Sequence, residues 1–167
     1  FNNRNDEYGG SLENRSRLMR ELISEMKEVA GDRAAIAVRM STDELLTFKS
    51  ESSESEAHEF FEINGEFPDL WDIKMSSWFK ECPSGRFAES GHMEPYNSFV
   101  KKLTSKPVVG VGWFTSPDIM AKQINDGILD FVGAARASIA DPFLPNKLKE
   151  GREDDIRECI GCNICAS

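Results

Sequence analysis

Short apolar segments alternate with helical patterns along this chain, and this alternation restricts its fold more than any other feature. Four segments are too short for helices and are bounded by loop residues, which predicts strands over 34–39, 70–75, 108–112 and 129–134. Helical patterns precede, separate and follow them, over 11–30, 55–63, 94–105, 116–127 and 141–151. Because strands separated by such helices pair in parallel, the sequence predicts an α/β fold with one parallel sheet.

Residues typical of helix ends mark several of these boundaries. Ser11 is the predicted N-cap of the first helix, and Gly31 follows its last turn. Asp141 and Pro142 are predicted to begin the last helix in the same way, as cap and first-turn residue. These caps support an alternation of helices and strands from residue 11 onward.

Two architectures fit this order of elements: an open doubly wound sheet and a (β/α)8 barrel. A complete barrel has eight strands and about 250 residues. This chain has 167 residues and four predicted strands. The first residue is Phe1 rather than Met, which suggests a piece of a longer chain. If the fold is a barrel, we therefore expect only part of it here.

The balance of charge narrows the classes of partner. The chain has 29 acidic and 20 basic residues, for a formal net charge of −9. This excess disfavours nucleic acid, because binding its backbone requires clustered Lys and Arg. No apolar run approaches the ~20 residues of a membrane-spanning helix, so no membrane partner is expected. Cysteines bunched at one end favour a reducing compartment, and we expect a cytoplasmic protein.

The carboxyl ends of the predicted strands are where parallel α/β folds place functional residues. The turn from Gly110 to Gly112 lets backbone N–H groups approach an anion, and Arg136, after the next strand, could bind a phosphate. A plain tight turn is the alternative for the glycines alone. Arg39 ends an apolar strand and is either a cation beside a bound cofactor or half of a salt bridge. Trp78 follows another strand end, among polar residues.

The ending CIGCNIC is the most specific local signal for a metal site. Its two overlapping CxxC steps place Cys159, Cys162 and Cys165 on one tight loop, as iron–sulfur clusters require. Zinc is the alternative metal. Either metal needs a fourth ligand, and Cys82, far away in the sequence, is not expected to supply it.

Several stretches of sequence resemble one enzyme family. NRNDEYGGSLENRSR is similar to the NxRxDxYGGSLENR signature of the Old Yellow Enzyme class of FMN-dependent barrel oxidoreductases. VVGVGWFTSP, GAARASIADPFLP and IRECIGCNIC resemble the subgroup with FMN and a 4Fe–4S cluster, which includes trimethylamine, dimethylamine and histamine dehydrogenases. The resemblance implies that residues 1–150 are the second half of an FMN-binding TIM (β/α)8 barrel, about strands five to eight. Residues 151–167 would then begin the cluster-binding segment.

The same resemblance assigns cofactor contacts. Arg39 matches the arginine at the pyrimidine edge of the flavin, and Arg136 matches the phosphate arginine. The rest of the implied FMN pocket consists of Gly110, Gly112, Trp113 and Ala135. Two positions depart from the family pattern: Trp113 stands where Arg is usual, and Ala137 stands where Pro is usual.

Substrate and cluster residues are implied in the same way. Trp78 matches a tryptophan of the aromatic bowl that binds a substituted ammonium, and Glu81 replaces an Asp that supports the catalytic His. The family's catalytic Tyr and His fall upstream of this chain. The implied cluster ligands are Cys159, Cys162 and Cys165, whose CxxCxxC spacing is that of the amine dehydrogenases rather than of the dienoyl-CoA reductases.

The resemblance implies an FMN- and 4Fe–4S-dependent oxidoreductase that oxidatively dealkylates a small secondary or tertiary amine. Its electrons would pass to an electron-transfer flavoprotein or a similar acceptor, and the full-length protein is expected to be a homodimer. One alternative is an NAD(P)H-dependent ene-reductase similar to 2,4-dienoyl-CoA reductase. A second is a zinc-binding module without enzymatic activity.

Overall fold

A computed structural model of the chain describes residues 2–43, 52–75 and 88–166. Its helices are α1 (Leu12–Arg15), α2 (Arg17–Ala30), α3 (Ser52–Asn64), α5 (Glu94–Asn97), α6 (Pro117–Asn125), α7 (Ala135–Ala140) and α8 (Leu144–Lys149). Its strands are β1 (Ala37–Asp43), β2 (Leu70–Met75), β3 (Val108–Gly110) and β4 (Phe131–Val132). Short 3-10 turns lie at Gly31–Arg33, Val100–Lys102, Glu153–Asp155 and Ile164–Ala166.

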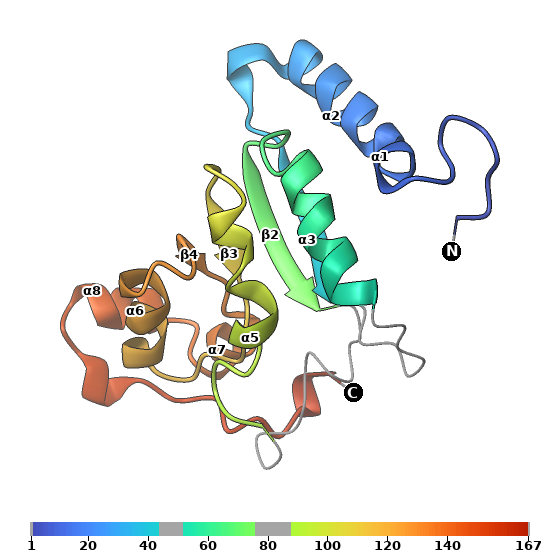
Figure 1. Ribbon diagram of the computed structural model, residues 1–167. Helices are drawn as coiled ribbons and strands as arrows, with labels where there is room; N and C mark the ends of the chain where they lie inside the picture. The colour runs from blue at the N-terminus through green and yellow to red at the C-terminus, as the bar shows by residue number, and fades with distance from the viewer. Residues whose placement is uncertain (1, 44–51, 76–87, 167) are drawn as a thin grey trace.

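The strands form one parallel sheet in the order β1-β2-β3-β4. This confirms the predicted parallel α/β fold. Consecutive strands are neighbours throughout, as in a (β/α) barrel, whereas a doubly wound sheet reverses its strand order. Helix α2 lies toward the β1 end of the sheet and α6 to α8 toward the β4 end (Figure 1). Within the described ranges, no helix is long and apolar enough to cross a membrane.

The helix-covered face of the sheet carries the core. Along β2, Trp71, Ile73 and Met75 are buried, while the residues that alternate with them are half-buried, as expected from the period of a strand. Phe60 and Phe61 of α3 pack edge-on against Trp71, with ring centroids 6.0 and 5.0 Å away. The indole N–H of Trp71 donates to the carbonyl oxygen of Gly65 at 2.8 Å, so this buried donor has a hydrogen-bond partner.

The first helical segment follows the prediction except for one break. The hydroxyl of Ser11 accepts a hydrogen bond from the backbone N–H of Asn14 at 3.2 Å, which confirms the predicted N-cap. Gly31 ends α2 with a φ of 51°, a conformation that glycine adopts readily. Ser16 interrupts the helix and separates α1 from α2.

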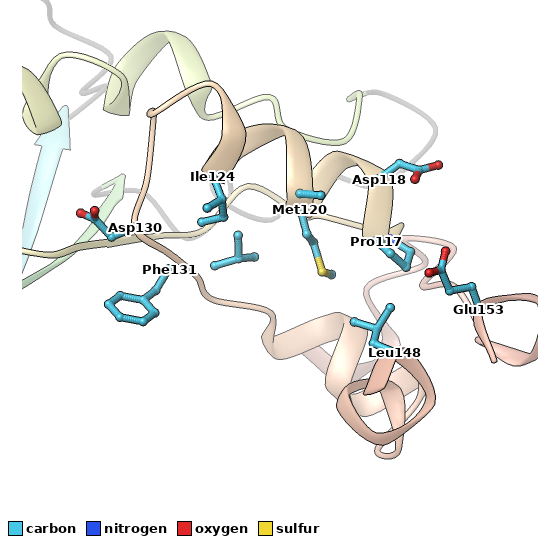
Figure 2. A pocket seen from close by; sticks show the side chains of 10 residues that line it. Pro117, Asp118, Met120, Ile124, Asp130, Phe131, Leu148 and Glu153 are labelled. Atoms are coloured by element: carbon cyan, nitrogen blue, oxygen red, sulfur yellow. The ribbon is translucent and has the colours of Figure 1, made fainter. Parts of the chain in front are cut away.

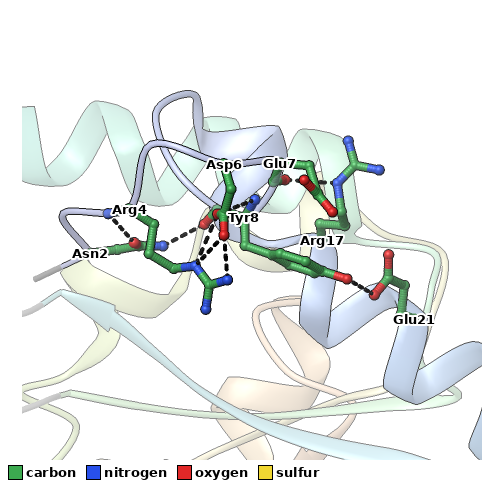
Figure 3. A network of polar contacts seen from close by, with 7 residues as sticks. All are labelled: Asn2, Arg4, Asp6, Glu7, Tyr8, Arg17 and Glu21. Atoms are coloured by element: carbon green, nitrogen blue, oxygen red, sulfur yellow. Dashed lines mark hydrogen bonds and ion pairs between the residues drawn. The ribbon is translucent and has the colours of Figure 1, made fainter.

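Charged side chains hold the loop that precedes α1 (Figure 3). Arg4 Nε donates to the two carboxylate oxygens of Asp6 at 2.9 and 3.1 Å, and this hydrogen bonding lowers the pKa of Asp6 to about 2. The Tyr8 hydroxyl donates to Glu21 Oε2 on α2 at 3.0 Å. A Cβ atom at Gly9 would lie 1.9 Å from the carbonyl oxygen of Arg4, so only glycine fits there. The residues of this motif therefore fix the loop against α2.

Strand β1 is displaced from its predicted span, and the difference concerns a predicted site residue. The prediction ended the strand at Arg39, but Arg39 is the third residue of β1. The prediction was wrong because the Arg39 side chain lies on the face of the strand opposite the core. A charged residue on that face does not end the strand. Val38 and Met40 pack against the core and Thr42 is buried, whereas the Arg39 side chain is 58% exposed.

Strand β4 is shorter than predicted and leads directly into a helix. The backbone N–H of Gly133 donates to Gly110 O at 2.8 Å, and Ala134 then leaves the extended conformation with φ −137° and ψ 63°. Ala135 and Arg136 lie in the first turn of α7. The predicted ends at 112 and 134 are therefore each two residues beyond the observed ends of β3 and β4.

Two predicted helices are also shorter, because polar side chains end or delay them. The helix predicted over 94–105 is reduced to α5 and a 3-10 turn, and the backbone N–H of Ser105 donates to the carboxylate of Glu66 instead of continuing it. The last helix begins at Leu144, so Asp141 is not its cap. Asp141 instead accepts from the backbone N–H of Phe143 at 3.1 Å, before the helix starts.

Candidate functional site

The exits of β3 and β4 bring two predicted pocket residues together. Trp113 follows the end of β3, and Arg136 lies in the first turn of α7, just after β4. The guanidinium carbon of Arg136 is 5.5 Å from the centroid of the Trp113 ring, a cation–π distance. The contact joins the two exit loops at the carboxyl edge of the sheet.

The β3 exit loop is held by hydrogen bonds to the segment that precedes α5. The backbone N–H of Gly91 donates to Gly112 O at 2.8 Å, and Ser90 Oγ donates to Trp113 O at 2.7 Å. Ser90 Oγ also accepts from the backbone N–H of Thr115 at 3.1 Å. These bonds fix Trp113 in the left-handed region, at a φ of 54°, which is rare for a bulky side chain.

The two glycines of the predicted turn lie against protein side chains. A Cβ atom at Gly110 would be 2.5 Å from Leu129 Cδ2, and one at Gly112 would be 3.0 Å from the ring of Phe114. Leu129 and Phe114 would have to shift to admit a side chain at either position, which favours glycine at both without any cofactor. Their contact with a cofactor remains a prediction.

The Trp113–Arg136 pair fits the phosphate group that FMN would bring. Trp113 Nε1 is buried, and no residue in the described part of the chain accepts a hydrogen bond from it. Buried polar atoms are rarely left in this state, so the indole N–H calls for an acceptor from elsewhere. A phosphate oxygen is such an acceptor, and the adjacent guanidinium supplies the opposite charge.

Arg136 also contacts the cysteine loop through a residue that the sequence analysis missed. Arg136 Nη1 donates to Asn163 Oδ1 at 2.8 Å. Asn163 lies between Cys162 and Cys165 and has a φ of 61°, a left-handed conformation that Asn tolerates. That tolerance is the only sequence signal for Asn163. Its contact joins residues 27 positions apart and depends on the fold.

The three cysteines are free thiols. Cys162 and Cys165 are exposed and Cys159 is partly buried. Over residues 2–43, 52–75 and 88–166, no three Cys, His, Asp or Glu side chains are close enough to hold a metal ion. The loop therefore carries three thiols at the CxxCxxC spacing, but the structure does not gather their sulfur atoms into a site.

Asp141 anchors the segment that leads to these cysteines. Its carboxylate accepts from Lys147 Nζ at 2.7 Å and from the backbone N–H of Arg157 at 3.0 Å. The Lys147 hydrogen bond, followed by that of Arg157, lowers the pKa of Asp141 to about 2. Lys147 Nζ also donates to Asp155 O at 2.6 Å. Asp141 and Lys147 thus tie the chain between α8 and the cysteine loop to the end of α7.

The remaining predicted site residues do not join this pair. Arg39 lies on β1, separated from β3 by β2, and its Nε is 3.7 Å from Asp72 Oδ2. This contact agrees with the salt-bridge alternative, although both side chains are partly exposed and such a pair contributes little stability. Ala135 is the exposed first residue of α7. Trp78 and Glu81 lie outside the described residues.

A separate apolar cavity of about 480 Å³ lies on the α6 side of β4 (Figure 2). Met120 and Ile124 of α6 and Leu148 of α8 project toward it, and Asp118 and Glu153 lie at its margin. None of the predicted site residues lines it.

The family of the chain follows from a comparison with known proteins. The model of one family, described as the NADH:flavin oxidoreductase / NADH oxidase family, matches residues 1–155. The chain belongs to this family. Membership confirms the resemblance to FMN-dependent oxidoreductases and supports an enzyme rather than a non-enzymatic module.

Individual relatives are similar over almost the whole chain. The dimethylamine dehydrogenase of Hyphomicrobium sp. (strain x) is 41% identical over 170 residues, 100% of this chain and 23% of that protein. The structure of histamine dehydrogenase from Rhizobium sp. 4-9 matches with a TM-score of 0.91 and 54% identity, over 97% of this chain and 23% of that one. The structure of 6-hydroxypseudooxynicotine amine oxidase from Pseudomonas geniculata N1 matches with a TM-score of 0.91 and 52% identity, over 98% of this chain and 24% of that one. The chain spans about a quarter of the length of these relatives.

Proposed function

We propose that the chain is the phosphate-binding part of an FMN-dependent oxidoreductase that oxidatively dealkylates a secondary or tertiary amine. The observation that carries the flavin assignment is the buried indole N–H of Trp113 beside the guanidinium of Arg136. The likeness to a dimethylamine dehydrogenase, a histamine dehydrogenase and an amine oxidase favours an amine as substrate.

The chain's own residues would bind and orient the cofactor. Arg136 and Trp113 would hold the phosphate, with the backbone around Gly110, Gly112 and Ala135 completing the pocket. Arg39, whose side chain is 58% exposed, would place a positive charge near the flavin ring. Bound FMN would supply the two-electron oxidation of the substrate. Trp78 and Glu81 are proposed to face the amine, the first through its ring and the second as a supporting carboxylate.

The cysteine loop is proposed to hold three ligands of a 4Fe–4S cluster, with residues 151–167 as the start of the cluster-binding segment. The CxxCxxC spacing and the accessible thiols of Cys162 and Cys165 support this. Binding would require the sulfur atoms to move closer together than they are here. Iron and acid-labile sulfide in the purified full-length protein, both lost in a Cys162→Ala variant, would support the cluster. Stoichiometric zinc would contradict it.

The proposed activity is tested by anaerobic titration of the full-length protein. Secondary or tertiary amines should bleach the flavin absorbance, and an electron-transfer flavoprotein should restore it. The competing ene-reductase activity, similar to that of 2,4-dienoyl-CoA reductase, predicts instead that NADH or NADPH bleaches the flavin and that an enone restores it. Bleaching by NAD(P)H but by no amine would overturn the proposal. A protein purified without flavin, and unable to take up added FMN, would overturn the cofactor assignment as well.

A homodimer and a cytoplasmic location complete the proposal. Light scattering on the full-length protein tests the first, and fractionation of the producing cells tests the second.

A further inference from the structure

Asn163 is the contact between the cysteine loop and the proposed phosphate site. Its amide oxygen accepts from Arg136 Nη1 at 2.8 Å, while the ring of Trp113 lies 5.5 Å from the guanidinium carbon of the same arginine. An arginine side chain has several rotatable bonds, so each contact to its guanidinium restricts the directions that it can take. Two contacts from different segments, one to an amide and one to a ring, fix the direction of the guanidinium plane.

We propose that Asn163 is a positioning residue that orients Arg136 toward the phosphate of FMN and so couples the cysteine loop to flavin binding. The inference depends on the proposed function, because it assumes that Arg136 contacts the phosphate. It adds a residue that does not itself touch the flavin. Ordering Arg136 before the ligand arrives removes part of the entropy loss on binding, which strengthens the affinity without a new contact.

The backbone conformation of Asn163 points to a role for its side chain. Its φ of 61° is most easily adopted by glycine, as Gly161 does at 64° two residues earlier. Glycine would satisfy the turn but would offer no acceptor for Arg136. The structure has Asn here, and its amide makes the contact.

The test compares flavins with and without phosphate. Apoprotein of the full-length wild type and of Asn163→Gly is titrated with FMN and with riboflavin, and each Kd is measured by flavin fluorescence. Asn163→Gly keeps the left-handed turn and removes the side-chain oxygen that accepts from Arg136. We expect it to weaken FMN binding about tenfold, the size of one hydrogen bond to a charged group, and to leave riboflavin binding unchanged.

Matched variants separate positioning from a general effect on folding. Asn163→Ala should give the same FMN-specific loss, with an added loss of thermal stability from its strained turn. Asn146→Ala, which removes an exposed amide on α8, should bind both flavins like the wild type. In an Arg136→Ala background, Asn163→Gly should have no further effect on FMN affinity, since the residue acts only through Arg136.

The following results would overturn the role proposed for Asn163. Unchanged FMN affinity in both Asn163 variants would overturn it, and so would an equal loss for FMN and riboflavin or additive losses in the double variant. A wild type that binds riboflavin as tightly as FMN would overturn the phosphate assignment itself, and this inference with it. The wild-type measurement thus distinguishes failure of the proposed function from failure of the role of Asn163.

Discussion

The two ends of the sheet are built in different ways. At the β1–β2 end the strands have seven and six residues, and aromatic rings from α3 cover the fully buried Trp71. At the β3–β4 end the strands have three and two residues, and specific polar contacts of Ser90, Asp141 and Arg136 hold the segments that follow. The difference teaches that apolar packing gives the first region its stability, while directed hydrogen bonds give the second its geometry.

The largest effect is expected on the free energy of unfolding, from a substitution at the apolar β1–β2 end. Trp71→Ala removes a fully buried ring and its hydrogen bond to Gly65, and should lower the free energy of unfolding of the full-length protein by ~3–5 kcal/mol. Urea denaturation measures this loss. Glu59→Ala, on the exposed side of α3, is the control and should change little. A loss below about 1 kcal/mol for Trp71→Ala would mean that packing at this end does not dominate stability.

The next largest effect is expected at the proposed phosphate site. Arg136→Ala removes the charge beside Trp113 and should weaken FMN binding by roughly 10- to 100-fold, with little change in unfolding free energy. Equilibrium dialysis of the apoprotein against FMN gives the affinity. Full FMN occupancy after gel filtration of the variant would show that the β4 exit does not bind the phosphate.

A smaller effect on thermal stability, seen mainly in its dependence on low pH, is expected for substitution of Asp141. Lys147 and the N–H of Arg157 lower the pKa of Asp141 to about 2, below the ~4 of an unfolded carboxyl. The ionised carboxylate therefore stabilises the fold above about pH 4, and this contribution disappears as the pH falls toward 2. Asp141→Asn should lower Tm at pH 7 by less than Trp71→Ala does, and should flatten the fall of Tm between about pH 4 and 2.

Thermal unfolding at several pH values measures this difference. Asp154→Asn, in the same segment and exposed, is the matched control and should follow the wild type. Parallel Tm curves for wild type and Asp141→Asn would show that the contacts of Asp141 do not stabilise this end of the molecule.

The smallest effect is expected for Arg39→Lys on β1. A lysine keeps the positive charge but not the planar fork, so FMN affinity should stay within about twofold of the wild type. The midpoint potential of the bound flavin should shift, which spectroelectrochemistry measures. An unchanged potential would indicate that Arg39 serves only its ion pair with Asp72.

The sequence predicted β2 and the parallel pairing of the strands better than the ends of the other three strands. Strand β2 was predicted over its observed span, and all four strands were predicted in parallel, because alternating burial leaves a local pattern. Arg39 was predicted to end β1 because, in sequence, a charge on the strand face opposite the core looks like a strand end. Helix α7 was not predicted, because it begins where Gly133 pairs with Gly110 and Ala134 then turns, which no local pattern encodes.

The candidate site shows the same limit. Trp113 and Arg136 were predicted as pocket residues, and the structure brings them together. Asn163 and the anchoring by Asp141 were missed, because each contact joins residues that are distant in sequence. Asp141 looked like a helix cap from its neighbour Pro142, but Leu144 begins the helix and Lys147 binds the carboxylate.

The left-handed backbone at Trp113 has a consequence for laboratory evolution. A bulky side chain at a φ of 54° costs of order 1–3 kcal/mol, which a glycine would recover. A saturation library at position 113 should therefore enrich Gly or Asn when clones are screened for heat tolerance, and Trp when they are screened for retained flavin. Selection in the two screens would diverge at this single codon, which makes it a poor target for stabilisation and a sensitive reporter of cofactor loss.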